Sequence, residues 1–131
     1  VIDLDTVMPG SALYDFGDLV RTSVSTCVED EIDTSKINVR LDRFEALVKG
    51  FLEGAGKCLT KTEIEYLPLC GRIITFECGI RFLTDFLDGD NYFKVHRENH
   101  NIQRARSQFQ LVKKMEELEK EMIAIVKKYH V

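Results

Sequence analysis

The hydrophobic positions along the chain follow two different periods. Over residues 1–6 apolar and acidic side chains alternate, whereas apolar residues in most of the remaining chain recur at spacings of three and four. The alternation predicts a short β-strand in which Ile2 and Leu4 face a core, while Asp3 and Asp5 share the opposite face, about 6.6 Å apart. The rest of the sequence predicts helices.

A first helix is expected after the turn at Pro9-Gly10. Asp15 is a suitable N-cap residue, because a carboxylate can accept hydrogen bonds from the free backbone N–H groups of the first turn. The polar stretch 29–36 then predicts a loop. The apolar positions of this helix are Phe16, Leu19, Val20, Val24 and Cys27.

A second helix is expected from Asp42, which begins an Asp-x-x-Glu start with Glu45. Two glycines, Gly54 and Gly56, favour its end. The apolar stripe consists of Phe44, Leu47, Val48, Phe51 and Leu52.

The third helix is expected to be long and central. Thr60 and Glu63 form a capping-box signature at its start, and Gly89 marks its end. Pro68 removes a backbone donor inside this segment, so a kink or a break is expected there. Apolar residues occur nearly all round it, which predicts burial from several sides: Ile64, Leu67, Ile73, Ile74, Phe76, Cys78, Ile80, Phe82, Leu83, Phe86 and Leu87.

A polar loop with scattered aromatic residues follows over residues 90–101, and a last amphipathic helix is expected over Ile102 to Tyr129. Its spacing follows 3.6 residues per turn better than a strict 3.5, which favours core packing over a coiled coil. The sequence therefore predicts one mainly α-helical unit over residues 1–131, with one short N-terminal strand and no linker.

Composition limits the class of protein. The 131 residues are 44% hydrophobic and 31% charged, which suits one soluble domain with its own core. The chain begins in mid-strand without Met, so we expect a piece of a longer protein. No apolar run approaches the roughly 20 residues that cross a bilayer, and no secretory segment is evident, which predicts a cytoplasmic protein without a membrane partner. The four cysteines lack zinc or redox spacing and are expected to be reduced core residues: Cys27, Cys58, Cys70 and Cys78.

The net charge of −4 is unevenly distributed. The first 35 residues carry eight acidic side chains against the single Arg21. No basic patch is dense enough to indicate a nucleic-acid partner.

The carboxylate pair at Asp3 and Asp5 suits a hard divalent cation. Mg²⁺ prefers one or two protein carboxylates and leaves its other positions to water and phosphates, so the pair points to a nucleotide-bound metal. The alternative is a strand end with two solvated acids. Asp15-Phe16-Gly17 spells the metal motif of protein kinases, but it lies at a predicted helix start, whereas Asp3 lies at a strand end.

Four segments together resemble the bacterial N-acetylhexosamine 1-kinases, within the aminoglycoside phosphotransferase and choline kinase superfamily: VIDLDTVMPG, LYDFGDLVRT, RFLTDFLDGDNYFK and HNIQRARSQFQLV. The resemblance runs nearly end to end. It implies that the chain is the C-terminal helical subdomain of a protein-kinase-like large lobe, with the nucleotide-binding lobe and the catalytic Asp upstream. It also implies ATP and Mg²⁺ as cofactors.

The resemblance further implies residue roles. Asp3 would hold the nucleotide-bound Mg²⁺, and Asp5 would be a second or outer-shell ligand. Three residues would brace the catalytic loop through buried ion pairs and helix capping, namely Asp15, Asp18 and Arg21. A guanidinium fork can hold sugar hydroxyls or an N-acetyl carbonyl, so Arg81 would face the sugar, and Tyr92 would stack on it or cover it.

Structural alternatives exist for most of these residues. Arg81 could simply pair with Asp85 at i+4, and Tyr92 with Phe93 could plug the loop against the long helix. His96 and His100 suit surface or capping roles. Phe76, Phe82 and Phe86 are expected in the core, as are Met115 and Met122.

The function expected is an ATP-dependent kinase that phosphorylates a sugar hydroxyl, plausibly the anomeric hydroxyl of an N-acetylhexosamine. The fragment alone would be inactive. One alternative is a kinase of the same superfamily that acts on an aminoglycoside, choline or another amino alcohol. The other is a non-catalytic binding module that docks a partner on the last helix.

Overall fold

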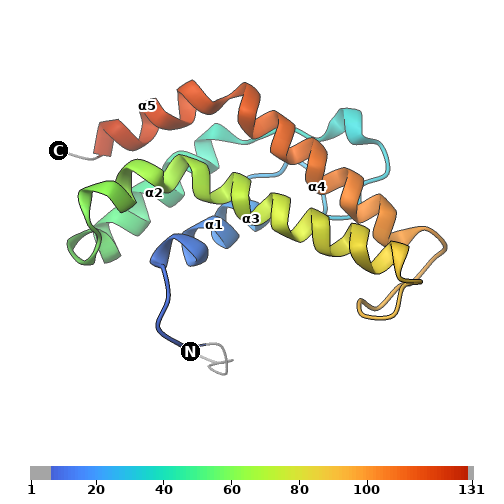
Figure 1. Ribbon diagram of the computed structural model, residues 1–131. Helices are drawn as coiled ribbons and strands as arrows, with labels where there is room; N and C mark the ends of the chain where they lie inside the picture. Colours follow the sequence, from blue (N-terminus) through green and yellow to red (C-terminus); the bar gives the residue numbers. More distant parts are fainter. Residues whose placement is uncertain (1–6, 130–131) are drawn as a thin grey trace.

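The computed structural model describes residues 7–129, and this part of the chain is mainly helical (Figure 1). The mainly α-helical class is thereby confirmed. The expected strand over residues 1–6, with Asp3 and Asp5, lies outside the described residues. The elements are α1 (Ala12–Ser23), η1 (Thr34–Lys36), α2 (Leu41–Ala55), η2 (Gly56–Cys58), α3 (Lys61–Leu87), α4 (His100–Glu117) and α5 (Glu119–Tyr129).

The long helix α3 is the central element. It packs against α1, against α4 over its C-terminal part and against α5 over its N-terminal part, while α2 packs on α5 and α1 (Figure 1). An antiparallel bridge between Ser25 and Val39 joins the two ends of the segment between α1 and α2. The five α-helices thus pack around one core.

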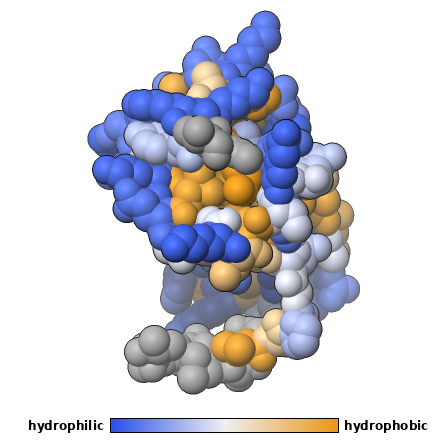
Figure 2. Space-filling model, turned by 90° about the vertical axis from the view of Figure 1, so that its left-hand side faces the viewer, coloured by the Kyte–Doolittle hydropathy of each residue, from blue (hydrophilic) through white to orange (hydrophobic). Residues whose placement is uncertain are grey.

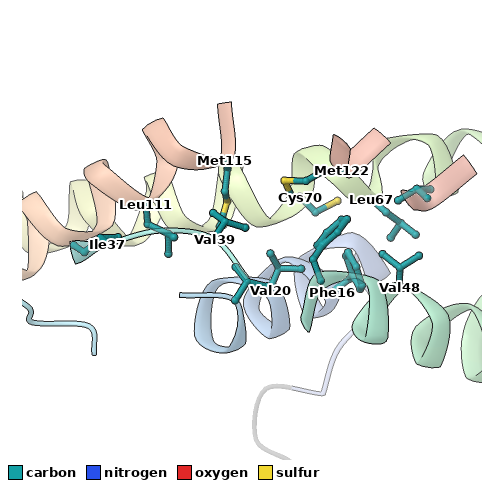
Figure 3. Packing of buried hydrophobic residues seen from close by; sticks show 13 residues of the cluster. Phe16, Val20, Ile37, Val39, Val48, Leu67, Cys70, Leu111, Met115 and Met122 are labelled. Carbon is teal, nitrogen blue, oxygen red and sulfur yellow. The ribbon is translucent and has the colours of Figure 1, made fainter. Parts of the chain in front are cut away.

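The core is built from the apolar stripes of all five helices and from the segment that precedes α2 (Figure 3). Met115 and Met122 are each 1% exposed, which confirms that they pack in the core. The labelled side chains of Figure 3 are Phe16, Val20, Ile37, Val39, Val48, Leu67, Cys70, Leu111, Met115 and Met122.

Two glycines allow α1 and α3 to pack closely. A Cβ on Gly17 would lie 2.8 Å from the backbone oxygen of Cys70, and a Cβ on Gly71 would lie 2.3 Å from Cγ1 of Val20. Real Cβ atoms do not approach so closely, so a side chain at either position would push the helices apart. The glycine of the Asp15-Phe16-Gly17 string is therefore explained by helix packing.

The start of α1 differs from the prediction. Ser11 is the N-cap residue, and its Oγ accepts a hydrogen bond from the Leu13 N–H at 3.3 Å. Asp15 lies inside the first turn and is exposed, so its predicted capping role is wrong. A serine in this position satisfies the same kind of free N–H groups and allows the helix to begin four residues earlier.

The start of α3 agrees with the prediction. Thr60 and Glu63 form a complete capping box, in which Oγ1 of Thr60 accepts from the Glu63 N–H at 3.2 Å and Glu63 accepts from the Thr60 N–H at 2.7 Å. Of the kink or break expected at Pro68, the break is wrong, because α3 continues through this residue to Leu87, while the kink stays a prediction. Packing against three other helices outweighs the hydrogen bond that proline cannot make.

The single last helix was also predicted wrongly. The chain turns at Leu118, and α4 and α5 are separate helices. No glycine or proline marks this point, since the bend serves tertiary packing. Met115 and Met122, on either side of the bend, are both buried, and Arg72 of α3 forms an ion pair with Glu119 at the start of α5 at 3.1 Å.

One face of α3 is less buried than expected. Ile73, Phe76 and Ile80 are each between 42% and 49% exposed, so Phe76 is not a core residue, whereas Phe82 is 4% exposed. Apolar surface is also visible at the end of the molecule seen in Figure 2, where it is framed by hydrophilic side chains.

All four cysteines lie within the described residues and are free. Cys70 is buried, which raises the pKa of its thiol to about 11. The prediction that the cysteines are reduced is therefore confirmed. The prediction that they lie in the core is wrong for Cys58, which is exposed.

Candidate functional site

The two side chains expected to contact a substrate lie together in a shallow depression where α3 ends. Its volume is about 270 Å³, and Arg81 and Tyr92 both line it. The other lining residues are Thr84, Asp85, Asp88 and Phe93. We refer to this depression as the Arg81–Tyr92 pocket.

Arg81 lies beside two aromatic rings. Its guanidinium carbon is 5.9 Å from the ring centroid of Tyr92 and 5.4 Å from that of Phe93, within the range of a cation–π interaction. Its Nε lies 3.6 Å from a carboxylate oxygen of Glu77, one turn earlier on α3. Because this pair is half exposed and at long range, it holds the guanidinium only weakly.

The alternative prediction, in which Arg81 pairs with Asp85, is wrong, because the Asp85 carboxylate binds the loop backbone. Asp85 is 5% exposed, and its two carboxylate oxygens accept hydrogen bonds from the backbone N–H of Tyr92 at 2.7 Å and of Phe93 at 2.9 Å. Burial raises the pKa of this carboxyl, but hydrogen bonds from the loop backbone and from Asn101 outweigh burial and lower the pKa below its ordinary value.

Asn101, at the start of α4, extends the contacts of Asp85. It is fully buried, and its Nδ2 donates to Asp85 at 2.7 Å and to Asp90 at 2.8 Å. Its Oδ1 accepts from Arg104 at 3.1 Å. This network joins the end of α3, the loop and the start of α4.

The loop between α3 and α4 has three residues in the left-handed region. Gly89 has φ 92°, Asp90 φ 59° and Asn99 φ 61°. Asp and Asn adopt this conformation more readily than other non-glycine residues. The hydrogen bond from Asn101 to the Asp90 side chain and the bond from the Asp90 N–H to the Asp85 carbonyl, both 2.8 Å long, fix the tight turn.

Phe93 and Tyr92 have different roles in the loop. The Phe93 ring packs on Phe82 with centroids 4.7 Å apart, so it does plug the loop against α3. The Tyr92 side chain is 75% exposed and meets Phe93 edge-on at 4.8 Å. An open aromatic ring, a guanidinium and nearby carboxylates can together stack on a ring-shaped ligand and hydrogen-bond to its polar groups.

The three residues expected to act as a brace are only partly connected. Asp18 accepts from Nε of Arg21 at 2.9 Å, and Arg21 also donates to Glu29 at 2.8 Å. Asp18 is exposed, so this ion pair is at the edge of the core and is not buried as expected. Asp15 is not part of it.

His100 was expected at the surface or in a cap, but it is buried. Its Nε2 lies 3.0 Å from Asp30, and its Nδ1 accepts from the backbone N–H of His96 at 3.2 Å. Arg97 binds the same carboxylate at 2.9 Å. The bond to His100 and the adjacent Arg97 lower the pKa of Asp30, and the three side chains fasten the acidic 29–33 segment to the loop before α4.

The predicted metal ligands Asp3 and Asp5 lie outside the described residues. Among residues 7–129, no group of three or more His, Cys, Asp or Glu side chains is arranged to hold a metal ion. None of the helices in that range has the length and hydrophobicity needed to cross a membrane. No family model matches the sequence.

Sequence reasoning missed Asp85 and Asn101 as parts of the site. Asp85 was considered only as a partner for Arg81, although it stands on the buried face of α3 with Phe82. A carboxylate at a core-facing helical position must find donors, and this signal was present in the sequence.

Proposed function

We propose that the chain is part of an ATP-dependent small-molecule kinase that phosphorylates a sugar hydroxyl, plausibly the anomeric hydroxyl of an N-acetylhexosamine. The Arg81–Tyr92 pocket is the sugar-facing surface contributed by this chain. The nucleotide-binding lobe and the catalytic base belong to the upstream part of the same polypeptide.

One observation carries the proposal. Arg81 and Tyr92, which the family resemblance assigns to the acceptor sugar, are eleven residues apart in sequence, yet they line one depression, with the guanidinium carbon 5.9 Å from the ring centroid. An exposed aromatic face beside a fork of N–H donors is suited to a sugar, because the ring covers C–H groups and the donors meet hydroxyl or carbonyl oxygens.

In the proposed function, the segment before residue 7 binds the Mg²⁺ ion that accompanies ATP. Phosphoryl transfer needs a metal-holding acid, a phosphate cradle and a positioned base. In this proposal Asp3 and Asp5 are the metal-holding acids, because Mg²⁺ takes one or two protein carboxylates and leaves its other positions to water and phosphates. When bound, the metal would neutralise charge on the phosphate oxygens.

The test is steady-state turnover of the longer protein with ATP, Mg²⁺ and N-acetylglucosamine. Asp3→Ala should lower kcat by at least about a hundredfold, since it removes a charge that acts on the transition state. Asp42→Asn, an exposed site on α2, is the matched control and should leave turnover unchanged. Near wild-type turnover by Asp3→Ala would refute the metal role.

Two alternatives are decided by the same assay. An amino-alcohol kinase would use choline or an aminoglycoside in preference to the sugar; Asp88 in the pocket is compatible with a cation, whereas Arg81 opposes it. A binding module would show no turnover with any acceptor. The isolated 131 residues should also show none, because the base is missing.

A further inference from the structure

We propose that Asp85 is a positioning residue of the Arg81–Tyr92 pocket, whose carboxylate holds the loop backbone so that the Tyr92 ring stays beside the Arg81 guanidinium. The inference rests on the proposed function, which assigns the pocket to the acceptor sugar. Asp85 does not act on the reacting atoms.

The Tyr92 ring is not held by side-chain packing. It is 75% exposed, and its aromatic neighbour Phe93 meets it only edge-on. The side of the pocket on which it stands therefore depends on the backbone from which it projects. That backbone is bound at two successive N–H groups, those of Tyr92 and Phe93, and both bonds end on Asp85.

The chemistry of these bonds requires a carboxylate. Three N–H groups converge on the two oxygens of Asp85, from Tyr92, Phe93 and Asn101. An ionised carboxylate only accepts, so it can satisfy all three. An asparagine of the same shape would place its own NH₂ group against one of these donors and leave that donor unpaired.

The arrangement couples both walls of the pocket to one helix. Arg81 and Asp85 lie four residues apart on α3, about one turn. Asp85 carries the Tyr92 backbone, and Arg81 carries the guanidinium 5.9 Å from the Tyr92 ring. The two sides of the pocket are thereby anchored on the same helix.

Asn101 provides a second support from α4. It bridges Asp85 and Asp90, and Asp90 holds a left-handed conformation with φ 59°. Without this bridge the carboxylate would still bind the two backbone N–H groups. Loss of Asn101 should therefore have a smaller effect than loss of the charge on Asp85.

The experiment measures amide hydrogen exchange and sugar binding by NMR on the 131-residue chain. Asp85→Asn should accelerate exchange at the Tyr92 and Phe93 amides about tenfold or more, because charge-assisted bonds are lost. It should also weaken the affinity for N-acetylglucosamine by a similar factor. The affinity is measured from the chemical-shift changes that the sugar induces at Tyr92 and Arg81. Asn101→Ala should do both to a smaller extent, and it serves if Asp85→Asn fails to fold. Asp42→Asn should change neither.

In the longer protein, Asp85→Asn should raise KM for the sugar more than it lowers kcat. A loosened loop with unchanged sugar affinity would overturn the positioning role while leaving the proposed function in place. Wild-type exchange rates at Tyr92 and Phe93 in Asp85→Asn would overturn it as well. If wild-type protein shows neither sugar-induced shifts nor turnover, the proposed function fails and the positioning role fails with it, although the exchange data would still show whether Asp85 orders the loop.

Discussion

At the residue scale, several positions accept only one type of residue, because another side chain would collide with a neighbour or leave a hydrogen-bond donor unpaired. Gly71 is an example, since any side chain there would collide with Val20 across the α1–α3 crossing. Asp85 is another, since only an acceptor suits the three donors that surround it. Both residues are fixed by partners that lie outside their own helix.

Gly71→Ala should lower the free energy of unfolding by about 1–3 kcal/mol, because a Cβ 2.3 Å from Cγ1 of Val20 forces the two helices to shift. Gly50→Ala is the matched control on α2. A Cβ at Gly50 meets open space, so this variant should gain about 0.5–1 kcal/mol from helix propensity. Urea unfolding of both variants is the measurement, and equal effects of the same sign would contradict the close packing of α1 on α3.

The acid sensitivity of the protein should depend in part on Asp85. The folded state lowers the pKa of this carboxyl, so its contribution to stability is present above the ordinary aspartate pKa and is lost as pH falls through the folded value. The stability difference between wild type and Asp85→Asn should therefore be largest near pH 7 and should shrink toward pH 2. Urea midpoints across this range test it, and a constant difference would contradict the assignment.

At the element scale, local signals predicted both ends of α3, whereas the serine cap of α1 at Ser11 was missed. The capping box at Thr60 and the end of α3 before Gly89 follow directly from residue types. The turn at Leu118 has no such signal, because it results from α5 packing across α2 and α3. Pro68 gave a strong local signal that tertiary packing outweighed.

Thr60→Ala should lower the free energy of unfolding by about 1 kcal/mol, since it removes the acceptor for the Glu63 N–H. Thr62→Ala, at the exposed neighbouring position, should change it by no more than about 0.5 kcal/mol. Thermal or urea unfolding distinguishes the two. A similar loss in both variants would show that the cap has no special role.

At the scale of the whole molecule, the sequence predicted the mainly helical class and the apolar stripes of the core. It also selected Arg81 and Tyr92, which the fold brings into one pocket. It did not predict the Asp85–Asn101 network or the burial of His100 against Asp30, because these contacts join residues 16 and 70 positions apart. Such pairings depend on how α4 is placed along α3.

The sugar kinase that we propose would need an acceptor pocket in this chain and a metal-bound nucleotide held together with an upstream lobe. The most direct measurement is ³¹P NMR of the products that the longer protein forms from ATP, Mg²⁺ and an N-acetylhexosamine. We predict a sugar phosphate resonance that appears together with ADP and that is strongly reduced in Arg81→Ala. ATP that stays intact with the sugar present, or a product that forms equally well in Arg81→Ala, would contradict this account.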